Sequence, residues 1–195
     1  MNTRTVALSL LVAGLVTGGN LWLHMGDTPL GYTEYSRYGF SLLHPSNWYT
    51  YEGGFTDPGM GASDVHGMFQ AVLFTEDHVE LMQVGWQTSV EAPEGAPSVE
   101  EVVQSIESTP NTTVTSIGPL KTFNKDGFEV TYTVFGVVQR GQPLTAVVGT
   151  MAQPWPSLRS YRVYVLSYAA DSASTSEAQA EERFLELLGS FRSPA

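Results

Sequence analysis

Alternating and helical patterns of apolar residues divide most of the chain into strands and two helices. Between Phe128 and Val134, apolar and polar residues alternate strictly, which is the period of a strand with one buried face. Other strand-like runs cover residues 69–74, 79–87, 114–123, 144–151 and 161–168. The joints between consecutive runs are short and polar, so the pattern predicts an antiparallel sheet with meander connections.

Two segments repeat their apolar residues with the period of a helix. The first follows Ser98, which forms a capping-box pattern with Glu101, and the second begins at Ser176. Their apolar stripes are Val99, Val102, Val103 and Ile106 in the first helix, and Phe184, Leu187, Leu188 and Phe191 in the second. The strand 161–168 is apolar on both faces, so we expect helices on each side of the sheet. The predicted fold class is α+β, an α-β-α sandwich around an antiparallel meander.

The segment 35–48 predicts how the folded domain begins. Phe40, Leu42 and His44 share one face of a short strand, which Pro45 ends, and Trp48 follows as a second large apolar residue. These features mark a fold and not a catalytic site. Residues 51–67, rich in Gly, Asp and Met, are expected to form the longest loop.

The N-terminal residues have the layout of a targeting segment. Arg4 precedes an uncharged, largely apolar run over residues 6–23, so residues 1–25 are expected to be either a cleaved signal peptide or a retained membrane anchor. Residues 26–31 then form a linker, and residues 32–195 form one domain outside the cytoplasm. In this interpretation the domain contacts the membrane only through its N-terminal segment.

The segment Tyr38-Gly-Phe-Ser-Leu-Leu-His-Pro-Ser-Asn-Trp48, followed by a hairpin, a helix, four strands and a final helix ending in Gly-Ser-Phe191, resembles the PsbP-like family. That family includes extrinsic lumenal subunits of photosystem II, a Ran-binding protein, and bacterial lipoproteins and secretion chaperones. The resemblance implies an α-β-α sandwich without enzymatic activity that acts as a docking or assembly module. The chain lacks the lipidated cysteine of the lipoprotein members, and no metal ligands of the photosynthetic members map onto it.

Charge and cysteine content exclude several classes of function. The formal net charge is −11, with 20 acidic residues and nine Lys and Arg, so nucleic acid is not expected as a partner. The chain has no cysteine, which excludes disulfides, thiolate metal sites and a cysteine nucleophile. No Gly-x-Ser-x-Gly, Ser-x-x-Lys or phosphate-loop motif is present, so we expect no enzymatic activity.

Aromatic residues in predicted loops are the candidates for binding a protein partner. Trp155 lies between two prolines, which argues against a central strand and places the indole on a loop, as an anchor or as a lid. Tyr51, Phe55 and Met60 lie in or beside the long loop. We therefore expect these four residues to contact a protein partner, either a membrane-complex subunit or an exported client, through loops at one end of the sheet.

An alternative function is small-molecule or divalent-cation binding in the region 51–78. Asp57, Asp64 and His66 offer the oxygen and imidazole ligands that such a cation accepts, although their spacing is not that of an EF-hand loop. No other cofactor is expected.

Overall fold

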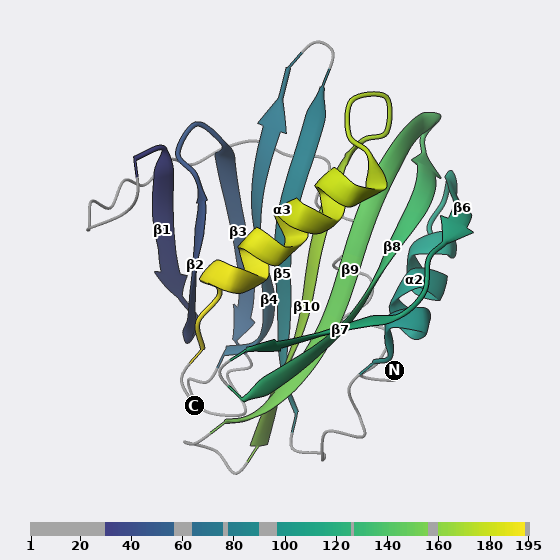
Figure 1. The fold of residues 1–195 in the computed structure, drawn as a ribbon. Helices are drawn as coiled ribbons and strands as arrows, with labels where there is room; N and C mark the ends of the chain where they lie inside the picture. Colours follow the sequence, from purple (N-terminus) through teal and green to yellow (C-terminus); the bar gives the residue numbers. More distant parts are fainter. Residues whose placement is uncertain are drawn as a thin grey trace.

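The chain forms two antiparallel sheets and two helices in the part that the structure describes (Figure 1). The computed structural model describes residues 30–56, 64–75, 78–89, 97–125, 127–155 and 160–193. The expected signal or anchor segment, residues 1–25, lies outside them. None of the helices within these ranges has the length and apolar character needed to cross a membrane.

The larger sheet has eight strands, and its order is β3-β4-β5-β10-β9-β8-β6, with β7 also paired to β8. All of its pairings are antiparallel. The strands are β3 (Tyr49–Thr56), β4 (Asp64–Phe74), β5 (Val79–Ser89), β6 (Thr112–Ile117), β7 (Lys121–Lys125), β8 (Phe128–Gln139), β9 (Gln142–Trp155) and β10 (Ser160–Asp171). The predicted antiparallel meander is therefore confirmed for β8, β9 and β10.

A separate two-stranded hairpin precedes this sheet. It consists of β1 (Tyr32–Arg37) and β2 (Phe40–Pro45), joined at Tyr38 and Gly39, which have φ angles of 51° and 75°. Positive φ at both central residues is the signature of a tight type I′ hairpin turn. As predicted, Phe40, Leu42 and His44 form the buried face of β2.

The hairpin is held to the body of the molecule by aromatic contacts and by the C-terminus. The ring of Tyr35 stacks on that of Phe69 at 3.9 Å between centroids, and Phe40 stacks on Phe191 at 5.6 Å. Beyond the last helix, the backbones of Ser41 and Arg192 exchange two hydrogen bonds of 2.8 and 2.7 Å. The two ends of the domain are therefore joined to each other.

Both predicted helices form, the first with the predicted capping box and the second from Ser176 as expected, where the structure adds a capping box that was not predicted. Helix α2 (Val99–Glu107) is capped by Ser98 and Glu101, and helix α3 (Glu177–Ser190) by Ser176 and Gln179. Helix α3 packs on β2, β8, β9 and β10, whereas α2 packs on β6, β8 and β9. The expected antiparallel sheet with two helices is confirmed, but the fold is richer in sheet than predicted. The sandwich with a helix layer over each face is not confirmed, because α2 has only nine residues and its main packing is on β6, β8 and β9.

Two predictions about the strands were wrong. The run 114–123 is two strands, β6 and β7, because Gly118-Pro119-Leu120 breaks the ladder where proline lacks an N–H donor. The expected loop 51–67 contains the end of β3 and the start of β4, which pair with each other. Gly53 and Gly54 concealed this strand in the sequence, since glycine is depleted in strands.

A charged network ties α3 to β7 and β8. The amine of Lys121 lies 2.6 and 2.7 Å from the two carboxylate oxygens of Glu181, and the hydroxyl of Tyr132 donates to the same carboxylate at 2.8 Å. The bonds from Lys121 and Tyr132 hold the pKa of Glu181 below its usual value. Burial and the bond to Glu181 raise the pKa of Tyr132 to about 12.

The lowered pKa of Glu181 predicts a loss of stability in acid. The folded state prefers the charged carboxylate, so this contribution is complete above the unfolded pKa of about 4.3 and is lost as the pH falls below it. We expect Glu181→Gln to lower the free energy of unfolding at pH 7 and to have a smaller effect at about pH 3. Urea unfolding of both proteins at the two pH values measures this, and an equal difference at both would contradict it.

Candidate functional site

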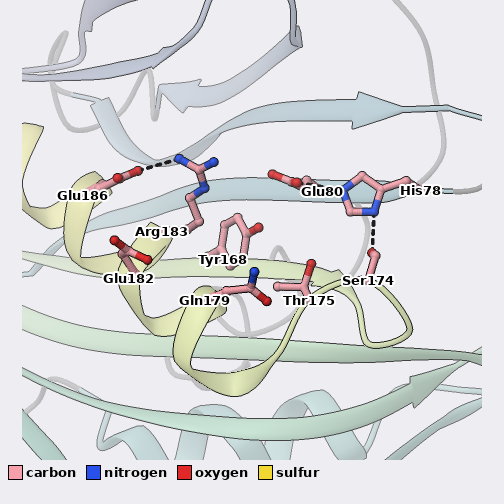
Figure 2. A pocket seen from close by; sticks show the side chains of 9 residues that line it. All are labelled: His78, Glu80, Tyr168, Ser174, Thr175, Gln179, Glu182, Arg183 and Glu186. Carbon is pink, nitrogen blue, oxygen red and sulfur yellow. Dashed lines mark hydrogen bonds and ion pairs between the residues drawn. The ribbon is translucent and has the colours of Figure 1, made fainter.

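A polar hollow of about 500 Å³ opens between β5, β10 and the start of α3 (Figure 2). Its floor includes Tyr168 from the sheet, which is 1% exposed. The other lining residues are His78, Glu80, Ser174, Thr175, Gln179, Glu182, Arg183 and Glu186. The volume lies in the range of pockets that hold small molecules in proteins.

The turn between β10 and α3 positions one wall of the hollow. The carbonyl of Asp171 accepts hydrogen bonds from the backbone N–H groups of Ser174 and Thr175, at 3.2 and 3.0 Å. The capping box of Ser176 and Gln179 then starts the helix. The turn and the capping box bring Ser174 and Thr175 beside the sheet, and the first three turns of α3 supply the remaining wall.

His78 connects the turn to strand β5. Its Nδ1 lies 2.7 Å from the Ser174 hydroxyl, and its Nε2 lies 2.7 Å from a carboxylate oxygen of Glu80. A serine, an imidazole and a carboxylate in sequence are the components of a nucleophilic triad. Here, however, the Ser174 hydroxyl also bonds to the Asp171 carbonyl at 3.2 Å, which fixes it within the turn. The arrangement therefore favours a structural link between β5 and the turn over nucleophilic catalysis.

The charges that line the hollow are mostly negative. Glu80, Glu182 and Glu186 supply three carboxylates against one guanidinium, that of Arg183. Arg183 donates to Glu186 at 2.9 Å, which raises the pKa of the guanidinium. Burial raises the pKa of Tyr168, and its interactions with Glu80 add to the rise, so Tyr168 remains a neutral donor. Counted over these carboxylates and the guanidinium alone, the lining has a formal excess of two negative charges.

The aromatic residues expected to contact a partner are only partly described. Tyr51 is 39% exposed on β3, next to Tyr49, which shares its strand face two residues earlier and is 66% exposed. Phe55 and Trp155 are placed by their backbones, near the end of β3 and at the end of β9. The expectation that Trp155 lies in a loop was wrong, since it pairs with Ser160 across the β9–β10 hairpin. Pro154 lies beyond Thr150, where the pairing of β9 with β8 ends, and proline is tolerated at a strand edge of this kind. Met60 lies outside the described residues.

The residues expected to bind a cation fall at the β3–β4 hairpin. Thr56 pairs with Asp64 and Phe55 with His66, beside a break in the strand register. Burial lowers the pKa of His66. Asp57 lies outside the described residues. Within the described ranges, no group of three or more His, Cys, Asp or Glu residues is arranged to hold a metal ion.

Sequence reasoning did not identify the hollow of Figure 2. The region 51–78 proposed for small-molecule or cation binding ends at His78, but the sequence indicated no role for Ser174, Thr175 or Glu182. One signal was present: Glu182 and Glu186 are four residues apart and therefore share a face of the last helix. The strand that this face lies against could not be read from the sequence.

Together these elements define a small α+β domain with an antiparallel sheet, two helices and an open polar pocket. No protein-family model matches the chain, and no curated protein does. Among solved structures, the chain is similar to the solution structure of cyanobacterial PsbP (CyanoP) from Synechocystis sp. PCC 6803. The TM-score is 0.52 and the identity 14%, over 90% of this chain and 100% of the other. The chain therefore has a PsbP-like fold, which confirms at the level of fold the resemblance found in its sequence.

Proposed function

We propose that this protein is a non-enzymatic binding module that docks a protein partner at one end of its large sheet. One observation carries the proposal: strands that are far apart in the sequence finish at the same end of the sheet. In the register of the sheet, the end of β3 at Thr56, the end of β5 at Ser89 and the end of β9 at Trp155 lie at the same end. This register supports the proposal, because the contact residues Phe55 and Trp155 belong to strands that finish at the same end of the sheet.

The size of this sheet end suits a protein partner. Four strand spacings separate β3 from β9 in the order β3-β4-β5-β10-β9, which is about 19 Å at about 4.8 Å per spacing. Contacts spread over this width are typical of a protein interface. Tyr51 lies four residues before Phe55 on β3, and its exposed ring extends the surface toward the middle of the strand. Exposed tyrosine and tryptophan are the residues that most often dominate binding energy.

The net charge of the chain indicates which charge the partner's surface should have. At a net charge of −11, a basic or neutral surface is favoured as the partner over an acidic one. We propose an exported client or a membrane-complex subunit with an apolar groove that accepts Tyr51 and Trp155, and with basic residues around it. The setting is outside the cytoplasm, with the membrane reached through residues 6–23.

The test is capture of the partner by matched variants. The full chain, tagged at its C-terminus, is purified from its own membranes in mild detergent, and the co-purifying protein is identified by mass spectrometry. We expect Tyr51→Ala and Trp155→Ala each to reduce capture at least about tenfold, because loss of a central aromatic anchor typically costs 2 kcal/mol or more. Their thermal unfolding should be unchanged.

Ile117→Ala is the matched control for these variants. Ile117 is 63% exposed on β6, at the other edge of the large sheet, and its loss should leave capture intact. Equal capture by wild type, Tyr51→Ala and Trp155→Ala would contradict the proposal. So would the absence of any stoichiometric partner.

Divalent-cation binding at the β3–β4 hairpin is a second candidate function. It is favoured by the register that puts Asp64 and His66 on the same short stretch of β4, opposite the end of β3. Mass action then predicts that added Mn²⁺ or Zn²⁺ raises the unfolding temperature of wild type but not of Asp57→Ala or Asp64→Ala. An equal rise in all three proteins, or no rise, would exclude this site.

A further inference from the structure

A small apolar groove lies on the face of the large sheet against which α2 packs. It has a volume of about 80 Å³, and none of the residues that line it is charged. Helix α2 forms one wall through Ile106, and strand β5 forms the other through Val79 and Leu81. Because α2 packs mainly on β6, β8 and β9, toward the β6 edge of the sheet (Figure 1), the groove remains between α2 and β5.

Two alanines in the floor create this groove. In the register of the sheet, one row runs across β5, β10, β9 and β8 and consists of Leu81, Ala169, Ala146 and Phe135. Residues that are directly paired lie on the same face of a sheet, and all four line the groove. The two methyl side chains in the middle of the row stand between two much larger side chains, so the surface is hollow over β10 and β9.

One side chain of the groove is buried and has a polar atom without a partner. Gln83, which lies two residues beyond Leu81 and therefore on the same face of β5, lines the groove and is 1% exposed. Its Oε1 accepts a hydrogen bond of 2.5 Å from Gln70 on β4, but its Nε2 makes no hydrogen bond. Because β4 and β10 flank β5 on opposite sides, an amide whose oxygen faces β4 has its nitrogen on the side of β10. An unpaired buried N–H group is costly, so a bound oxygen that accepts from Nε2 would be favoured.

We propose that this groove binds a short, uncharged aliphatic chain that carries one hydroxyl or carbonyl oxygen. The oxygen accepts a hydrogen bond from Gln83 Nε2, and the chain lies over Ala169 and Ala146 toward Ile106. A water-sized group needs about 10–15 Å³ of cavity, so the volume of about 80 Å³ holds about five to eight such groups, which corresponds to about six carbons and the oxygen. A charged end group is disfavoured, because the lining has no opposite charge to offset its loss of hydration.

The experiment is a titration of the purified full chain with 1-hexanol, followed by methyl NMR. We expect saturable shifts at the lining methyl groups of Ile106 and Leu81, and none at Leu187, which is buried on the α3 face of the sheet. Ala169→Leu should weaken binding at least about tenfold, because the added side chain takes the place of about two methylenes of the ligand. Gln83→Met keeps the length of the side chain and removes its amide, so it should weaken binding about fivefold through the loss of one hydrogen bond.

Ala152→Leu is the matched control for Ala169→Leu. Ala152 lies on the same face of β9 as Ala146, six residues further along and outside the lining of the groove. The substitution adds the same side chain, and the variant should bind 1-hexanol as wild type does. Hexanoate has a chain of the same length with a charged end, and it should bind wild type at least about tenfold more weakly than 1-hexanol does.

Several results would overturn the proposal. These are the absence of saturable shifts in wild type, an unchanged affinity in Ala169→Leu or Gln83→Met, equal weakening by Ala152→Leu and Ala169→Leu, and equal affinity for hexanoate and 1-hexanol. An unchanged methyl signal of Leu187 confirms that each variant is folded. The row of Leu81 and Ala169 lies toward the opposite end of the sheet from Ser89 and Trp155, so the result does not depend on partner capture.

Discussion

Replacement of Phe184 by alanine is expected to destabilise the protein by about 3–5 kcal/mol, the range measured for large aromatic residues removed from a core. Phe184 is fully buried at the centre of α3 and packs on the ring of Tyr132, 5.5 Å away between centroids. It also sits over Gly149 of β9, where an added Cβ would come within 2.8 Å of its ring. The phenyl ring thus fills a space that the absence of a side chain on β9 creates.

Urea denaturation at pH 7 measures this change. Leu185→Ala is the control, because Leu185 is the next residue on the same helix and only partly buried. We expect its effect to be less than half that of Phe184→Ala. Similar losses for the two variants would mean that α3 does not pack on the sheet through the face described above.

A second large effect is expected at Gly67 on β4. A Cβ there would lie 2.2 Å from the Trp86 ring and 2.6 Å from the carbonyl oxygen of Gly53. Trp86 is 3% exposed and stacks on Tyr38 at 4.7 Å, so it has little room to move. The carbonyl belongs to the backbone of the neighbouring strand. We expect Gly67→Ala to cost about 3 kcal/mol, at the upper end of the range for an overpacked core.

Gly53→Ala is the matched control for Gly67→Ala. Gly53 lies opposite Gly67's neighbour Met68 in the same hairpin, and its added Cβ would meet only Tyr51, at an ordinary distance of 3.7 Å. Thermal unfolding should therefore show a large shift for Gly67→Ala and a small one for Gly53→Ala. If Gly67→Ala unfolds at the wild-type temperature, the Trp86 ring does not pack against β4 at Gly67 as described above.

The elements that were predicted correctly are those whose signal is local. The capping box at Ser98 marks where α2 begins, and the expected start of the last helix at Ser176 is also found. The alternation from Phe128 to Val134 correctly places Val130, Tyr132 and Val134 on a buried face of β8, because the side-chain period of a strand does not depend on its neighbours. Thr133, expected on the outward face, is buried as well, since the opposite face of this strand is covered too. The hydrophobic face of β2 was visible for the same reason.

The features that were missed depend on contacts across the sequence. The pairing of β3 with β4 is set by register between two Gly-containing segments, and neither has a clear alternation. The position of Trp155 in β9 depends on its pairing with Ser160, which local proline rules do not reveal. The polar hollow requires β5 and β10 to lie beside the start of α3, so no single stretch of sequence could indicate it.

The central claim, that a protein partner docks at the sheet end formed by β3, β5 and β9, is tested most directly by site-specific photo-crosslinking. A photoreactive amino acid is placed at position 155 or 51 of the full chain in its native membranes, and at position 117 as the control. We predict an adduct with one protein from positions 155 and 51, and none from position 117. Adducts from position 117 alone, or equally from all three positions, would contradict docking at this end of the sheet.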